Sequence, residues 1–236
     1  MFKFIKNIIS KKEIQKIEPL LEVENLQPVI EAQKMKKEGN ALLRVGDLNG
    51  AEEMYRKSIN INPLDTDTFL NLGWLLSEKK MLSDAKVELN KVLDLILNKT
   101  LDVGNVNDNN LLSSNLCDAY YILGSIEEKE NNIQGAINYF KYSLKANNKF
   151  ELVYTDLCRL LFSVGNYDEA KEIILEGLNV NPKNANFHFY LGNIYSHSHE
   201  FNLAAIEYNT AISIDETHAE AKVARIEIEK ELLVNQ

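Results

Sequence analysis

The chain has 236 residues, of which 45% are hydrophobic, and a formal net charge of −9. This acidic balance argues against a nucleic-acid partner, because no excess of Lys and Arg is present to displace the counterions of a phosphate backbone. No apolar run approaches the ~18 residues of a transmembrane helix, and with only 2 cysteines we expect a reduced, cytoplasmic protein.

The first predicted element is a basic, amphipathic segment over residues 1–27. Within residues 1–16, five lysines stand against one glutamate and are interleaved with apolar residues. Such a segment can lie on an anionic membrane surface or in the groove of another protein. We instead expect a helix that folds back on the structure after it, or a mobile tail, because terminal segments are commonly disordered.

A period of 34 residues organises residues 28–234. Small residues mark it, and only the interval from Gly73 to Gly124 differs, at 51 residues. An alanine follows each small residue by 12 positions, and a large apolar residue follows by 16. The small residues are Gly39, Gly73, Gly124, Cys158 and Gly192; the alanines are Ala51, Ala85, Ala136, Ala170 and Ala204; the large residues are Tyr55, Leu89, Phe140, Ile174 and Tyr208. A fixed period of this length indicates a solenoid of stacked supersecondary units.

Each period predicts two helices, in units near residues 32–64, 66–97, 117–148, 151–182 and 185–216. The turn residues Gly46 and Gly165 separate the two helices of their units. Asp65 and Asn184 are the expected N-caps of the helices that follow them. The small residue is needed where the helices of a pair cross closely, since a larger side chain would force the backbones apart.

Two further segments complete the chain. Residues 98–114 interrupt the period and are rich in Asn and Asp. We expect a polar, solvated loop there, since its acids lack the ligand spacing of a calcium loop. Residues 217–234 predict a final helix that caps the last open apolar face of the stack. Its apolar side carries Ala221, Ala224, Ile228 and Leu232.

These positions resemble the tetratricopeptide repeat (TPR) family. The fifth unit, for example, runs Leu191, Gly192, Tyr195, Ala204, Tyr208 and Ala211. The resemblance implies an all-α, right-handed α-solenoid of about five helix-turn-helix units with a C-terminal capping helix. The chain departs from the family pattern at Cys158, which replaces a glycine, at Gly177, and in the closing proline that three units lack. None of these departures changes the expected fold.

In this family the first helix of each unit lines a concave groove that binds a protein or peptide. The resemblance therefore implies a set of partner-binding residues at the inward positions. They are Lys36, Asn40, Arg44, Asn71, Trp74, Tyr121, Ser125, Thr155, Arg159, Phe189, Tyr190, Asn193 and His197. The four aromatic residues among them are either anchors for a peptide or packing against neighbouring helices.

Some members of the family grip the C-terminal carboxylate of a chaperone tail. Lys36, Asn40 and Asn71 match the positions used in the first two units. In the third unit, however, Asp118 and Ile122 stand where basic residues are needed. An acid there would repel a carboxylate, so we do not expect such a clamp.

No pattern in the chain predicts catalysis. His197 and His199 are two residues apart, and on a helix they would point to different faces, so we expect no metal site. No phosphate-binding loop or nucleophile–base arrangement is readable, and no cofactor is expected. We predict a non-enzymatic scaffold for protein partners. The alternatives are a targeting or substrate-presenting region of a larger enzyme, of the glycosyltransferase or methyltransferase type, and a self-assembling protein.

Overall fold

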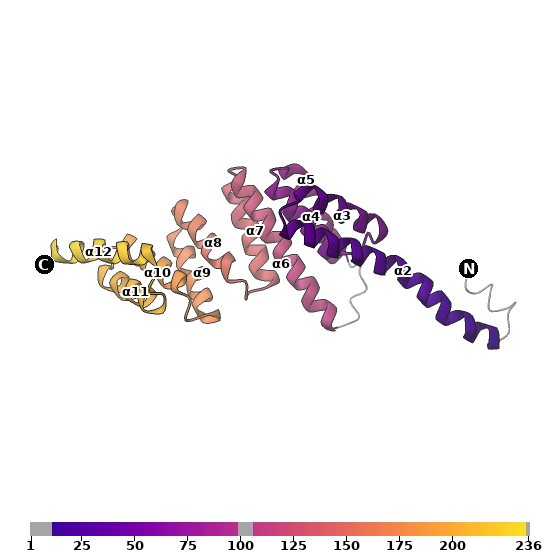
Figure 1. Cartoon of the computed structure of the whole chain (residues 1–236). Helices are drawn as coiled ribbons and strands as arrows, with labels where there is room; N and C mark the ends of the chain where they lie inside the picture. Colours follow the sequence, from indigo (N-terminus) through magenta and orange to yellow (C-terminus); the bar gives the residue numbers. More distant parts are fainter. Residues whose placement is uncertain (1–10, 99–105, 235–236) are drawn as a thin grey trace. The chain divides into compact units, whose positions relative to one another are not determined.

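A computed structural model describes the backbone of residues 11–98 and 106–234, and the side chains of residues 27–98 and 111–233. Within these residues the regular elements are all α-helices (Figure 1). The chain divides into two compact units, Met1–Gly104 and Asn105–Gln236. The first holds α2 (Lys11–Arg44), α3 (Leu48–Ile61), α4 (Thr66–Glu78) and α5 (Leu82–Leu97). The second holds α6 (Val106–Lys129), α7 (Ile133–Ala146), α8 (Glu151–Ser163), α9 (Tyr167–Val180), α10 (Ala185–His197), α11 (Phe201–Ile214) and α12 (Ala219–Val234).

Consecutive helices pack as pairs, and the pairs stack within each unit. In the first unit α2 packs on α3 and α4 on α5, and α3 joins the two pairs through α4. In the second unit the pairs are α6 with α7, α8 with α9 and α10 with α11, and α12 packs on α11 and α10. This arrangement confirms the all-α helical-repeat fold.

The small residue of each period allows the two helices of a pair to approach closely. A Cβ added to Gly39 would lie 2.7 Å from the ring of Tyr55, and one added to Gly124 would lie 2.6 Å from the ring of Phe140. Both rings are almost completely buried. The glycine of the first helix therefore faces the large residue 16 positions later, and the spacing seen in the sequence is the helix–helix contact itself.

The turn inside every pair has one residue in the left-handed backbone conformation. The five residues are Gly46, Lys80, Asn131, Gly165 and His199, with φ between +58° and +83°. They follow the same intervals as the small residues, 34, 51, 34 and 34 positions. Only two of them are glycine, although glycine adopts this conformation at the least cost. A glycine in the sequence therefore indicates only two of these five turns.

The two predicted N-caps behave differently. Asn184 caps α10, because its side chain accepts hydrogen bonds from the backbone N–H groups of Asn186 and Phe187. Asp65 occupies the N-cap position of α4 but makes no such bond. Its carboxylate instead accepts a hydrogen bond from the Thr68 hydroxyl, at 2.8 Å, and pairs with Lys36.

Two sequence-based boundaries do not match the helices. The first helix begins at Lys11, so residues 11–27 belong to the same helix as the first repeat; residues 1–10 lie outside the described residues. The loop expected over residues 98–114 is wrong for its second half, because α6 already begins at Val106. Asn and Asp lowered the helical preference of this stretch, yet it continues directly into a strongly packed helix.

The final helix packs as predicted on its apolar side. Ala221 and Ile228 are buried, and Ala224 and Leu232 pack against the cluster formed with α11. Other apolar residues of this helix are not covered by its neighbours. Val223, Ile226 and Leu233 are among the exposed large hydrophobic residues of the chain.

Candidate peptide-binding site

The predicted binding residues of the second unit lie on its first helices, α6, α8 and α10. We call their shared surface the first-helix face. Arg159 of α8 reaches back to α6 and donates two hydrogen bonds to the Glu128 carboxylate, at 2.8 and 2.9 Å. Tyr121 of α6 donates to Asp156 of α8, at 3.0 Å. The bonds from Arg159 and the bond from Tyr121 run in opposite directions between the same two helices and hold the polar groups of the face in fixed positions.

The electrostatics follow from these contacts. The paired Glu128 carboxylate raises the pKa of the Arg159 guanidinium above its ordinary value. Burial, together with the negative charge of Asp156, raises the pKa of Tyr121 to about 12. Arg159 is therefore a fixed cation, and Tyr121 a neutral donor, over the whole physiological range.

Three of the four aromatic candidates, Tyr121, Phe189 and Tyr190, are partly buried. Tyr121 packs against Phe140 and Phe150, with ring centroids 5.5 and 5.0 Å apart. Phe189 contacts the ring of Tyr190, at 5.4 Å, and burial raises the pKa of Tyr190. Each ring packs on one side and keeps part of its surface exposed, which suits an anchor that is already rigid before a partner arrives.

Two hydroxyl candidates bond within their own helices. Ser125 donates to the carbonyl of Tyr121, at 3.1 Å, and Thr155 donates to the carbonyl of Leu152, at 2.8 Å. Their hydroxyl oxygens can still accept hydrogen bonds from a partner.

The candidates on α10 border a depression between α10 and α12. Asn193 accepts a hydrogen bond from the Tyr208 hydroxyl, at 2.8 Å, and His197 lies against the ring of Tyr167, with centroids 3.7 Å apart. A hollow of about 760 Å³ is lined by both of them and by α12. His199 also lines this hollow and packs on Phe201. In the described part of the chain, no three His, Cys, Asp or Glu side chains are placed to hold a metal ion.

In the first unit, the predicted residues of α2 and α4 form a polar cluster. Lys36 pairs with Asp65, at 3.0 Å, and with Asp67, at 3.3 Å. Asn71 donates to Asn40, at 3.4 Å, and Asn40 also accepts from the Tyr55 hydroxyl, at 2.7 Å.

These contacts disfavour the binding of a carboxylate at Lys36. The Lys36 ammonium has only 12% of its side chain exposed and already neutralises two carboxylates. Binding a third carboxylate would require breaking these pairs.

Arg44 and Trp74 are the exposed members of the first-unit set. Arg44 makes no hydrogen bond or ion pair with the residues whose side chains are described, and Trp74 is 41% exposed. They offer a cation and a large ring to a partner, the residue types that most often dominate binding energy.

Three acidic residues that orient the candidates were not among the predicted binding residues. Glu128, Asp156 and Asp65 fix the orientation of Arg159, Tyr121 and Lys36, but none was selected. A signal was present, because each of these contacts joins residues 29 to 35 positions apart, close to one period. A carboxylate about one period away from a lysine, an arginine or a tyrosine would have identified them.

The second helices carry an equivalent pattern of buried hydroxyls. Ser58 of α3 donates to the carbonyl of Ala32, and Ser143 of α7 donates to the carbonyl of Cys117, both across 26 positions. Each bond fixes a second helix to the first helix of its own pair and keeps the first-helix face in register.

Comparison with known proteins agrees with this geometry. Two tetratricopeptide repeat models match residues 37–63 and 129–188. A TPR repeat-containing protein of Methanocaldococcus jannaschii is 26% identical over 149 residues, 62% of this chain and 24% of that protein. The matched region thus spans about a quarter of the length of that relative.

Several solved structures have the same fold. MamA protein is 23% identical, with a TM-score of 0.60, covering 80% of this chain and 94% of MamA. YrrB, described as a TPR protein with an unusual peptide-binding site, is 20% identical, with a TM-score of 0.60 and 86% and 96% coverage. PilF of Pseudomonas aeruginosa is 15% identical, with a TM-score of 0.65 and 87% and 86% coverage. At these identities the likeness is one of fold. The paired helices and the two repeat matches show that the chain contains tetratricopeptide repeats.

Proposed function

We propose that this protein is a non-enzymatic, cytoplasmic scaffold that binds a peptide or protein segment along the first-helix face. The observation that carries the proposal is the continuity of polar and aromatic groups over three successive first helices. Tyr121, Arg159 and Tyr190 come from α6, α8 and α10, and Arg159 lies close enough to affect the ionisation of Tyr190. A partner segment lying across these helices would meet preorganised donors, acceptors and rings without an ordering cost on the scaffold side.

Site-specific photo-crosslinking tests this proposal. A benzophenone side chain would be placed at Thr155 on the first-helix face and, as a matched control, at Leu175 on α9, which is 42% exposed. We expect a discrete crosslinked partner from Thr155 and none from Leu175. Equal capture from both positions, or capture from Leu175 alone, would refute binding along the first-helix face.

A second candidate function is that of a targeting or substrate-presenting region in a larger enzyme. It is favoured by one observation: the archaeal relative is about four times as long as the region that matches it. Reading the gene beyond the codon for Gln236 tests it, because an immediate stop codon would exclude a fused catalytic domain on that side.

In the part of the chain that the structure describes, no helix is both long and apolar enough to cross a bilayer.

A further inference from the structure

A trough lies between α10 and α12, at the C-terminal end of the first-helix face. It consists of two hollows, of about 760 and about 380 Å³. Both are lined by Ala224 and Glu227 of α12, so they adjoin each other along this helix. A continuous depression of this size accommodates several side chains of an extended segment.

The floor of the trough is apolar. The smaller hollow is lined by Phe189 of α10 and by Val223 and Ala224 of α12. Val223 is 57% exposed. The larger hollow adds the ring of Tyr208 and the side chain of Ile228. This floor suits the aliphatic part of a bound side chain.

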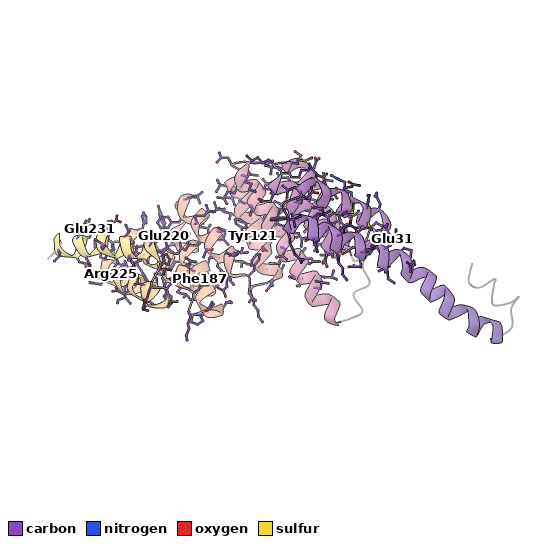
Figure 2. All side chains as sticks on the ribbon, in the orientation of Figure 1. Glu31, Tyr121, Phe187, Glu220, Arg225 and Glu231 are labelled. Atoms are coloured by element: carbon purple, nitrogen blue, oxygen red, sulfur yellow. The ribbon has the colours of Figure 1, made fainter. Side chains whose placement is uncertain are left out.

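The rim of the trough is acidic. Glu220 and Glu227 border the smaller hollow, and Glu231 and Lys230 join Glu227 at the larger one. Three carboxylates therefore face a single ammonium group. Glu220 and Glu231 lie on the same helix (Figure 2).

Neither carboxylate at the smaller hollow pairs with a lysine or arginine whose side chain the structure describes. The Glu220 side chain is 73% exposed, and its carboxylate lies 3.3 Å from the His218 ring. Glu227 makes no ion pair with any side chain that the structure describes. The acidic bias continues toward α8, because Glu220 and Asp156 both act on the ionisation of Tyr190.

This combination selects one kind of ligand group. A lysine or arginine side chain can lay its methylene groups on an apolar floor and place its charge among carboxylates at the rim. A carboxylate or phosphate would be repelled at the same place. A purely apolar residue would leave the charges at the rim without a counterion.

We propose that this trough binds a basic segment of a partner protein, with a lysine or arginine side chain between Glu220 and Glu227 and an apolar neighbour on the Phe189–Val223 floor. This inference rests on the proposed function and names the chemistry of the segment that the first-helix face receives. The charge at the trough provides selection, and the apolar floor provides contact area.

The test uses the full chain and a short fluorescent peptide of repeated Lys-Ala-Leu triplets, measured by fluorescence anisotropy. The double variant E220Q/E227Q keeps side-chain size and removes two charges. The matched control, E172Q/E176Q, removes two charges from exposed positions on α9. Each exposed charge pair is worth up to about fivefold in affinity. We therefore expect the double variant to weaken binding by about tenfold and the control by less than about twofold.

Two further measurements make the test specific. Replacing the peptide lysines by acetyl-lysine should abolish the difference between wild type and E220Q/E227Q. The charge reversal E227K should shift preference toward a peptide of Glu-Ala-Leu triplets. The inference would be overturned if E220Q/E227Q bound the lysine peptide as tightly as the wild type does. It would also be overturned if the wild-type chain did not bind the lysine peptide, or if it bound the lysine and glutamate peptides equally.

The inference and the proposed function can fail separately. If Thr155 crosslinks a partner whose binding is unchanged by E220Q/E227Q, the first-helix face binds a partner but the trough does not select a cation. If crosslinking shows no preference for the first-helix face, the proposed function itself fails.

Discussion

The close helix crossing inside each pair predicts a measurable cost for adding a single methyl group. Gly124→Ala would place a Cβ 2.6 Å from two carbon atoms of the Phe140 ring, which is only 1% exposed. Overpacking of a core costs about 1–3 kcal/mol, and a contact this far below van der Waals distance against a buried ring belongs in the upper part of that range, about 2–3 kcal/mol. Alanine recovers about 1 kcal/mol through its better helix propensity. We expect a net destabilisation of about 1–2 kcal/mol.

A second substitution distinguishes a local clash from a general loss of packing. Phe140→Ile, which introduces the residue type of the equivalent Ile174, should alone cost about 1–2 kcal/mol as a core replacement. In the double variant the replaced side chain leaves room for the new methyl group. The double variant should therefore be destabilised by about 1 kcal/mol less than the sum of the two single substitutions. The chain contains this combination already, because Cys158 occupies the small position of its pair and Ile174, not an aromatic residue, stands 16 positions later.

Urea unfolding followed by far-UV circular dichroism measures these differences, with unchanged slopes required for the comparison. The reasoning would be refuted if Gly124→Ala were as stable as the wild type. Strict additivity of the two substitutions would equally show that the glycine does not serve the contact with Phe140.

Three further predictions follow from the backbone and the buried groups. The alanine of Gly165→Ala would meet no neighbouring atom, but it would have to adopt a φ of +80°, so this variant should lower the free energy of unfolding by about 1 kcal/mol. His199→Gly relieves a φ of +58° and should raise the free energy of unfolding by about the same amount. Urea unfolding measures both. Burial raises the pKa of the Cys158 thiol to about 12 from 9.0, so its thiolate fraction near neutral pH falls about a thousandfold. A thiol reagent should therefore modify Cys158 only after denaturant is added. Rapid labelling of Cys158 in the native chain would contradict this burial. The pKa of Tyr121 in the folded chain is raised to about 12 from 10.0, so its contribution to stability is complete below pH 10 and is lost as the pH rises toward about 12. Tyr121→Phe should therefore reduce the loss of stability between pH 10 and about 12. An unchanged loss in this variant would show that other groups cause it.

The period of the sequence was sufficient to predict the helix pairs because the contact it encodes is local. A glycine and the large residue 16 positions later belong to one pair, joined by a short turn, so their proximity does not depend on the rest of the chain. The same holds for the Asn184 cap and for the apolar side of the last helix. The extent of α6 was not predictable in this way, because its first turns have a composition typical of loops and become helical as a continuation of a packed helix.

The amino-acid sequence by itself determined the all-α repeat fold and which helix of each pair comes first. It also placed the candidate residues on those first helices. Only the tertiary structure decided which contacts these residues make. Lys36 pairs with Asp65 and Asp67, and Arg159 is held by Glu128. Glu220 and Glu227 border the trough without a lysine or arginine as partner. The physical reason is that a helical period specifies which side of a helix a residue occupies, whereas an ion pair between repeats depends on distances that exist only after the helices have stacked.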